Sequence, residues 1–148
     1  MSSNPFVGAW RLLSLETRSS SGEVSYPLGR DAVGLLLYAE QGYMSVSAMR
    51  AGRVRFKSGE LGAASPEEKL AAFDSYIAYS GRYDVEHDRV LHHVELCILP
   101  NWVGGSQERY FEFSGDRLTL RTPPATAGDV EWIVIWERVK GLATGNWR

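Results

Sequence analysis

Hydrophobic and polar positions alternate along this chain in short blocks rather than in long runs. Blocks rich in aromatic and β-branched residues are separated by turn residues such as Gly, Asp and Ser, a pattern typical of many short β-strands. The predicted strands cover residues 8–18, 32–39, 43–49, 79–85, 89–99, 107–113, 117–122 and 130–138.

One helix is predicted between the third and fourth of these strands. It begins after Ser65, whose side chain can cap the first turn and form a capping box with Glu68. Leu70, Phe73 and Ile77 then recur at helical spacing as an apolar stripe. We expect this stripe to pack on the strands or on a loop.

The links between the strands alternate between tight and long. Tight turns are expected around Gln41-Gly42, Glu86-His87 and Ser114-Gly115. The longer links cover residues 19–31, 50–78, 100–106 and 123–129. Alternate connections of an antiparallel meander lie at the same end, so the tight turns close one end and the long links surround the other. We therefore predict one all-β domain over residues 1–148, an eight-stranded up-and-down antiparallel barrel that is open at the long-link end.

Turn positions and alternation also predict which side chains point into the barrel. A two-residue turn at Glu86-His87 places Tyr83 and His92 inward and His93 outward, while the next hairpin places Arg109 inward. Other expected inward residues are Leu35, Leu37, Met44, Val46, Ala48, Val85, Val90, Val94, Leu96, Phe111, Phe113, Leu118 and Leu120. The expected outward residues include Tyr38, Ser45, Ser47 and Cys97.

The first and last strands should meet where the barrel closes. Alternation puts Trp10, Leu12, Ser14 and Glu16 on one face, with Glu16 near the mouth, and puts Trp132, Val134, Trp136 and Arg138 on another. Arg138 would then lie beside Trp10 at the closed end. A guanidinium stacked on an indole gains about 0.5–2 kcal/mol, so this contact would tie the two strands together.

Composition narrows the range of functions. The net charge of −2 argues against an electrostatic nucleic-acid binder. Cys97 is the single cysteine, which fits a reducing compartment, and no signal peptide or membrane-spanning run is visible, so a cytoplasmic protein is expected. No metal is expected, because His92 and His93 are adjacent on a strand and point to opposite faces. No cofactor is expected either, and no Gly-rich phosphate loop is present.

Several motifs resemble those of one known family. The matching stretches are Gly8-Ala9-Trp10-Arg11-Leu12, Ser25-Tyr26-Pro27-Leu28-Gly29, residues 32–38, Gly81-Arg82-Tyr83, His92-His93-Val94-Glu95, Pro100-Asn101-Trp102-Val103-Gly104 and Trp136-Glu137-Arg138-Val139. Over residues 8–139 the chain resembles the bacterial and fungal lipocalin-like domain family. The resemblance implies a calycin-type barrel with an internal cavity for a small, mostly apolar molecule, in a setting of secondary metabolism.

The candidate site is the inside of the barrel near its mouth. His92 could bond a ligand carbonyl or move a proton, or it could be a core histidine satisfied by Tyr83 or a backbone carbonyl. Arg109 could hold an anionic ligand group, or it could pair with Glu16. Trp102 could cover the ligand and Asn101 could bond it. The expected walls are Tyr83, Phe111, Trp132, Trp136 and Met44.

Three functions are compatible with these residues. The first is binding of a small hydrophobic or aromatic metabolite. The second is a cofactor-free isomerase, cyclase or dehydratase acting on a polyketide- or terpenoid-like substrate, with His92 as general acid or base and Arg109 stabilising an oxyanion. The third is a filled barrel that serves only as an interaction module. The expected partner is a small hydrophobic molecule, with no nucleic acid and no membrane, and a homodimer is possible.

Overall fold

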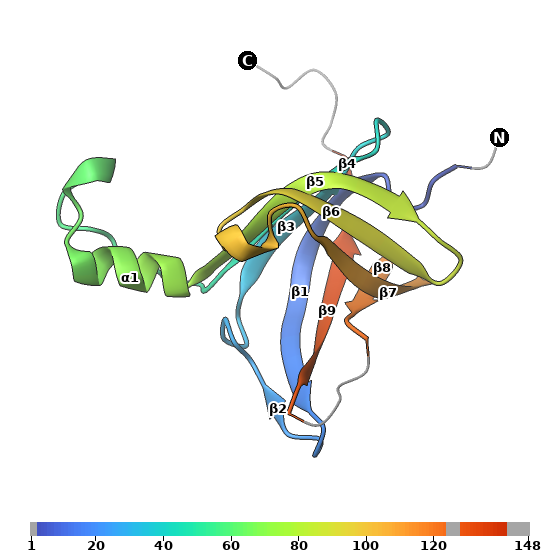
Figure 1. Ribbon diagram of the computed structural model, residues 1–148, viewed down its shortest axis with the longest axis horizontal. Coiled ribbons are helices and arrows are strands. Elements are labelled where there is room, and N and C mark those ends of the chain that lie inside the picture. Colours follow the sequence, from blue (N-terminus) through green and yellow to red (C-terminus); the bar gives the residue numbers. More distant parts are fainter. Residues whose placement is uncertain (1–2, 124–127, 142–148) are drawn as a thin grey trace.

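The computed structural model describes residues 3–123 and 128–141, and these residues form a sheet that closes on itself (Figure 1). The strands are β1 (Gly8–Ser19), β2 (Val24–Ser25), β3 (Val33–Tyr38), β4 (Tyr43–Met49), β5 (Tyr76–Val85), β6 (Arg89–Cys97), β7 (Ser106–Ser114), β8 (Arg117–Arg121) and β9 (Val130–Arg138). The helices are α1 (Pro66–Asp74) and the short 3-10 helices η1 (Leu61–Ala63) and η2 (Pro100–Trp102). The predicted link at 123–129 lies partly outside the described residues.

The strands form a closed antiparallel barrel, as predicted. Each long strand pairs with its neighbour in the chain, and β1 also pairs with β9, which leaves no open edge between the first and last strands. The two-residue strand β2 pairs only with the end of β1. The barrel proper therefore has eight strands, and α1 lies between β4 and β5, the third and fourth of them.

The two ends of the barrel differ, and the prediction that tight turns gather at one end is confirmed. The β3–β4, β5–β6 and β7–β8 turns lie at the end where β1 begins and β9 finishes. Arg138 stacks on Trp10 there, with its guanidinium carbon 4.2 Å from the ring centroid. The predicted contact between the first and last strands is therefore confirmed.

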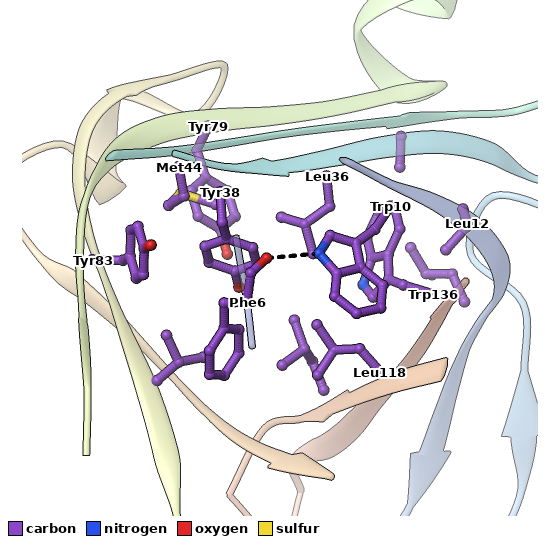
Figure 2. Packing of buried hydrophobic residues seen from close by; sticks show 14 of the residues in the cluster. Phe6, Trp10, Leu12, Leu36, Tyr38, Met44, Tyr79, Tyr83, Leu118 and Trp136 are labelled. Carbon is purple, nitrogen blue, oxygen red and sulfur yellow. Dashed lines mark hydrogen bonds between the residues drawn. The ribbon is translucent and has the colours of Figure 1, made fainter. Parts of the chain in front are cut away.

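Residues that precede β1 plug this end of the barrel (Figure 2). Phe6 is completely buried and makes edge-on contacts with Tyr38, Phe111 and Phe113 at centroid distances of 4.9–5.1 Å. The Trp10 indole N–H donates to the Phe6 carbonyl at 2.9 Å. Further hydrogen bonds hold this segment: Arg138 donates to the carbonyls of Pro5 and Val7, and the Asn4 amide donates to the Tyr83 hydroxyl at 3.0 Å.

The inward face predicted for β3 is wrong. Leu36 and Tyr38 are buried, whereas Leu35 and Leu37 are 45% and 47% exposed. The hairpin pairs Tyr38 with Met44, and Gly42 adopts a positive φ of 88°, as in a three-residue loop rather than the expected two-residue turn. A register shift of one residue moves every side chain of a strand to the opposite face.

Val85, predicted inward, is 44% exposed at the turn end of β5, and two β-bulges cause further errors in orientation. In β1, Leu12 pairs with Trp136 but Ser14 pairs with Ile135, so Leu13 is an extra residue and the alternation reverses after it. In β6, Val94 pairs with Gly81 and Leu96 with Ser80, which makes Glu95 the extra residue. The alternation reverses there too. Leu96 is therefore exposed, and Cys97 packs against the core.

The bulge in β6 coincides with a close approach of two strands. A β-carbon on Gly81 would lie 1.8 Å from the carbonyl oxygen of His93, so any side chain there would force the backbones apart. A glycine at this position is what the close backbone contact requires.

Helix α1 projects away from the barrel rather than packing on it (Figure 1). The predicted capping box between Ser65 and Glu68 is present. The predicted apolar stripe is not, because Leu70 and Phe73 are 62% and 48% exposed and Ile77 belongs to β5. Among the described residues, no helix is long and apolar enough to cross a membrane.

Candidate ligand cavity

A cavity of about 220 Å³ lies inside the barrel towards the end with the long links. Its walls come from every long strand of the barrel, together with η2. The lining residues are Leu15, Leu36, Val46, Ala48, Ile77, Tyr79, His92, Trp102, Gln107, Arg109, Leu120, Thr122, Trp132, Val134 and Trp136. Most of these side chains are apolar, and none of them is a carboxylate. The cavity is therefore an apolar chamber with a few polar groups, as small-molecule sites generally are.

His92 lies on the cavity wall, held between two tyrosines. Its side chain is 1% exposed, and its prediction as an inward residue is confirmed. Its Nε2 atom lies 2.6 Å from the Tyr38 hydroxyl oxygen, and its Nδ1 atom lies 2.7 Å from the Tyr79 hydroxyl oxygen. Both ring nitrogens are thus satisfied by side chains, but by different partners from the predicted Tyr83 or backbone carbonyl.

Burial keeps this cluster uncharged. Loss of solvent lowers the pKa of His92 to about 3, and the positive charge of Arg109 adds to the effect. Burial raises the pKa of Tyr79 to about 12 and the pKa of Tyr38 well above its ordinary value. At neutral pH the imidazole therefore has one N–H donor and one bare acceptor nitrogen.

Arg109 points into the barrel, as predicted, and lies on the cavity wall. Its guanidinium donates to the Glu108 carbonyl at 2.8 Å and to the Gln107 amide oxygen at 3.2 Å. No carboxylate of residues 3–123 or 128–141 forms an ion pair with it. The cation thus has neutral partners only, and an anionic or strongly polar oxygen would suit it.

Three tryptophans supply most of the aromatic wall, and all three were predicted as ligand contacts. Trp102, on η2, packs edge-on against Tyr79 with centroids 6.0 Å apart. Trp132 and Trp136 extend from β9 into the same chamber. Within the described part of the chain, Trp136 has a buried indole N–H with no acceptor. A buried donor without a partner is costly, about 1–3 kcal/mol, so this residue is a locally unfavourable group of the barrel.

The structure places five predicted ligand contacts outside the cavity lining. Tyr83, Phe111 and Met44 belong to the packed core at the plugged end, and Tyr83 donates its hydroxyl hydrogen to the Ala39 carbonyl. Asn101 is exposed on η2. Glu16 faces the other way because of the β1 bulge, and it pairs with Arg18 at 3.2 Å instead of with Arg109.

Sequence reasoning missed several residues of this region, among them Leu36, Ile77 and Thr122. Tyr79 is in phase with Tyr83 on β5, so its inward position was available from alternation alone. Leu15 follows Leu12 after three residues, a break in alternation that marks the bulge. Gln107 is in phase with Arg109 on β7. Tyr38 was assigned to the wrong face, for the reason given above.

His93 lies on the outer face, as predicted. Its Nε2 atom is 2.7 Å from an Asp84 carboxylate oxygen, and its Nδ1 atom is 2.8 Å from the Ser106 hydroxyl. These three residues connect β5, β6 and β7 across an exposed surface. Across the described ranges, no three His, Cys, Asp or Glu side chains are arranged to hold a metal ion.

A closed eight-stranded antiparallel barrel with an apolar chamber at one end defines the class of fold, and comparison with known proteins defines the family. The model of the lipocalin-like domain family matches residues 7–139, so the chain belongs to this family. Over 87 residues the chain is 38% identical to the 4'-hydroxy-3'-methoxypropiophenone carrier protein ppsC of Aspergillus oryzae, an alignment that covers 53% of this chain and 78% of that protein.

Two solved structures show weaker similarity. A lipocalin-like protein from Bacteroides uniformis has a TM-score of 0.46 and 13% identity, covering 92% of this chain and 100% of that one. A protein from Bacteroides eggerthii has a TM-score of 0.46 and 14% identity, covering 90% and 99%.

Proposed function

We propose that this protein binds one small hydrophobic, aromatic metabolite inside the barrel and carries it in the cytoplasm. The observation that supports the proposal most directly is the apolar chamber of about 220 Å³, with Arg109 on its wall and no carboxylate beside it. Pockets for drug-sized ligands measure roughly 300–1,000 Å³, so this smaller chamber suits a molecule of one or two rings. A curated relative that is named as a carrier adds support.

Binding is favoured over catalysis by the state of His92. A general base works best when its pKa lies near the working pH, and a pKa of about 3 makes this imidazole a weak base. Both of its nitrogens already have tyrosine partners at 2.6 and 2.7 Å. An isomerase, cyclase or dehydratase in the same chamber remains the second prediction. In the His92→Ala variant, unchanged affinity together with lost turnover would favour it.

The proposal is tested by native mass spectrometry of the purified protein and by titration with 2-naphthoic acid. We expect a co-purified small molecule or a saturable, one-to-one quenching of tryptophan fluorescence, since three tryptophans line the chamber. The Ala48→Leu variant should bind more weakly because the new side chain fills the chamber. Ser47→Leu is the matched control, since its side chain belongs to the opposite face of β4.

Absence of both a co-purified molecule and saturable binding would overturn the proposal. Equal affinities of the wild type and the Ala48→Leu variant would place the probe outside the barrel. The predictions of a possible homodimer, and of no nucleic-acid or membrane partner, stay predictions.

A further inference from the structure

The tyrosines on either side of His92 differ in what else their hydroxyls can reach. Tyr38 is 2% exposed, and Figure 2 shows it among Phe6, Met44 and Tyr79 in the packed core. Within the described residues, its hydroxyl has the Nε2 atom of His92 as its one hydrogen-bond partner. Tyr79 is 8% exposed and lines the cavity, whereas Tyr38 is not among the lining residues.

This difference decides the direction of the hydrogen bonds. The neutral imidazole donates through one nitrogen and accepts through the other, so one tyrosine donates to the ring and the other accepts from it. If Tyr38 accepted, its own hydroxyl hydrogen would be buried without an acceptor, which is costly. If Tyr79 accepts, its hydrogen is free for the cavity. The second arrangement leaves no donor stranded in the core.

We propose that Tyr38 donates to Nε2 of His92, that Nδ1–H donates to Tyr79, and that Tyr79 therefore presents its O–H to the cavity as a hydrogen-bond donor. Each bond in such a chain polarises the next, which strengthens the terminal donor. The proposal rests on the binding function proposed above and narrows its ligand class. The ligand presents an acceptor oxygen, such as a carbonyl oxygen, to the Tyr79 hydroxyl.

The other polar groups of the cavity agree with this ligand class. Arg109 carries only donors, and the amide oxygen of Gln107 is already occupied by that guanidinium. The Thr122 hydroxyl oxygen accepts from the Trp132 backbone N–H at 2.8 Å, which leaves the hydroxyl hydrogen to donate. The polar lining described here therefore offers donors in excess and selects an acceptor.

The direction of the chain is tested without a ligand by 15N NMR of the histidine rings. Protonated and bare ring nitrogens have well-separated 15N shifts, so the spectrum assigns the tautomer of His92. We expect the proton on Nδ1, and a proton on Nε2 would overturn the proposal. The His92→Gln variant identifies which signals belong to this residue.

Ligand selectivity is tested with 2-acetylnaphthalene and its isopropenyl analogue, in which a CH2 group replaces the carbonyl oxygen. The ratio of the two dissociation constants, measured by calorimetry, reports the bond to the oxygen. Tyr79→Phe should reduce the preference for the ketone by roughly threefold to tenfold, because one hydrogen bond is lost. Tyr83→Phe is the control, since that hydroxyl donates to Ala39 outside the cavity; its preference should match that of the wild type.

The outcomes separate the two proposals. If both probes bind and Tyr79→Phe keeps the wild-type preference, the donor assignment is wrong while cavity binding stands. If neither probe binds to the wild type but 2-naphthoic acid does, the ligand class is wrong while cavity binding stands. If 2-naphthoic acid also fails to bind and no small molecule co-purifies, the proposed function fails, and the NMR result separately decides the direction of the hydrogen bonds.

Discussion

The two ends of the barrel are built from the same strands, yet one end is solid and the other is hollow. At the plugged end Phe6 and Trp10 are completely buried, and aromatic rings meet edge-on. At the other end the wall residues surround about 220 Å³. Among the described residues, the Trp136 indole N–H has no acceptor, and Arg109 bonds only to the Glu108 carbonyl and the Gln107 amide oxygen. The strands supply similar side chains to both ends. The difference comes from residues 3–7, which fill one end from outside the strands.

This comparison suggests a division of roles along the barrel axis. Close packing stabilises the plugged end, and groups left without partners make the hollow end suitable for a ligand. Functional sites commonly contain such locally unfavourable groups, which the rest of the fold must offset. His92 marks the border, since Tyr38 on one side belongs to the core and Tyr79 on the other lines the cavity.

The largest effect is expected from removing the plug. Phe6→Ala should lower the free energy of unfolding by about 3–5 kcal/mol, because it leaves a void among three aromatic rings. Urea denaturation measures this change. Phe73→Ala on α1, where the ring is 48% exposed, should change stability by no more than about 0.5 kcal/mol. Equal effects of the two substitutions would show that Phe6 does not anchor that end.

The border residue should make stability depend on pH. The pKa of His92 is about 3 in the folded chain and 6.5 for the free side chain. As the pH falls, the imidazole is therefore protonated in the unfolded state before it is protonated in the folded state. The contribution of His92 to the free energy of unfolding is therefore fully present above pH 6.5 and is lost as the pH falls towards 3. Between about pH 6.5 and about pH 4 we expect a loss of about 3 kcal/mol from this group.

Comparison with His92→Gln isolates that loss from the titration of carboxylates. The glutamine side chain does not ionise, so the free energy of unfolding of the variant should fall less steeply with acid. Urea denaturation at a series of pH values gives both curves. Parallel curves would mean that His92 is not held neutral by the fold.

A smaller effect is expected from Arg138 at the plugged end. Arg138→Met removes the bonds to the carbonyls of Pro5 and Val7 and the stacking on Trp10. We expect the free energy of unfolding to fall by about 1–3 kcal/mol, as measured by thermal unfolding. Arg117→Met is a control on the exposed end of β8. An unchanged free energy of unfolding in the Arg138→Met variant would show that packing alone holds the plug.

The same substitution at the hollow end should have the smallest effect on stability. Arg109→Met should change the free energy of unfolding by less than about 1 kcal/mol, because the guanidinium has no ionic partner in the described chain. Its affinity for 2-naphthoic acid should fall roughly tenfold or more, since a charge-assisted bond is lost. A large loss of stability with unchanged affinity would reverse the roles of the two ends.

The sequence by itself determined the barrel, its closed and open ends, and several of its inward residues. Alternation and turn residues are local, and they were sufficient to place His92, Arg109, Trp132 and Trp136 inside. The Trp10–Arg138 contact also followed, because the first and last strands of a closed barrel must pair.

Only the tertiary structure decided where the cavity is and which polar groups meet there. The bulges at Leu13 and Glu95 and the three-residue loop before Tyr43 depend on how strands fit their neighbours, and each reverses a face. Tyr38 and His92 are 54 residues apart in the chain, so no local pattern links them. Phe6 lies outside every strand, and its place in the plug arises because an open, apolar barrel end is filled by the nearest large side chain.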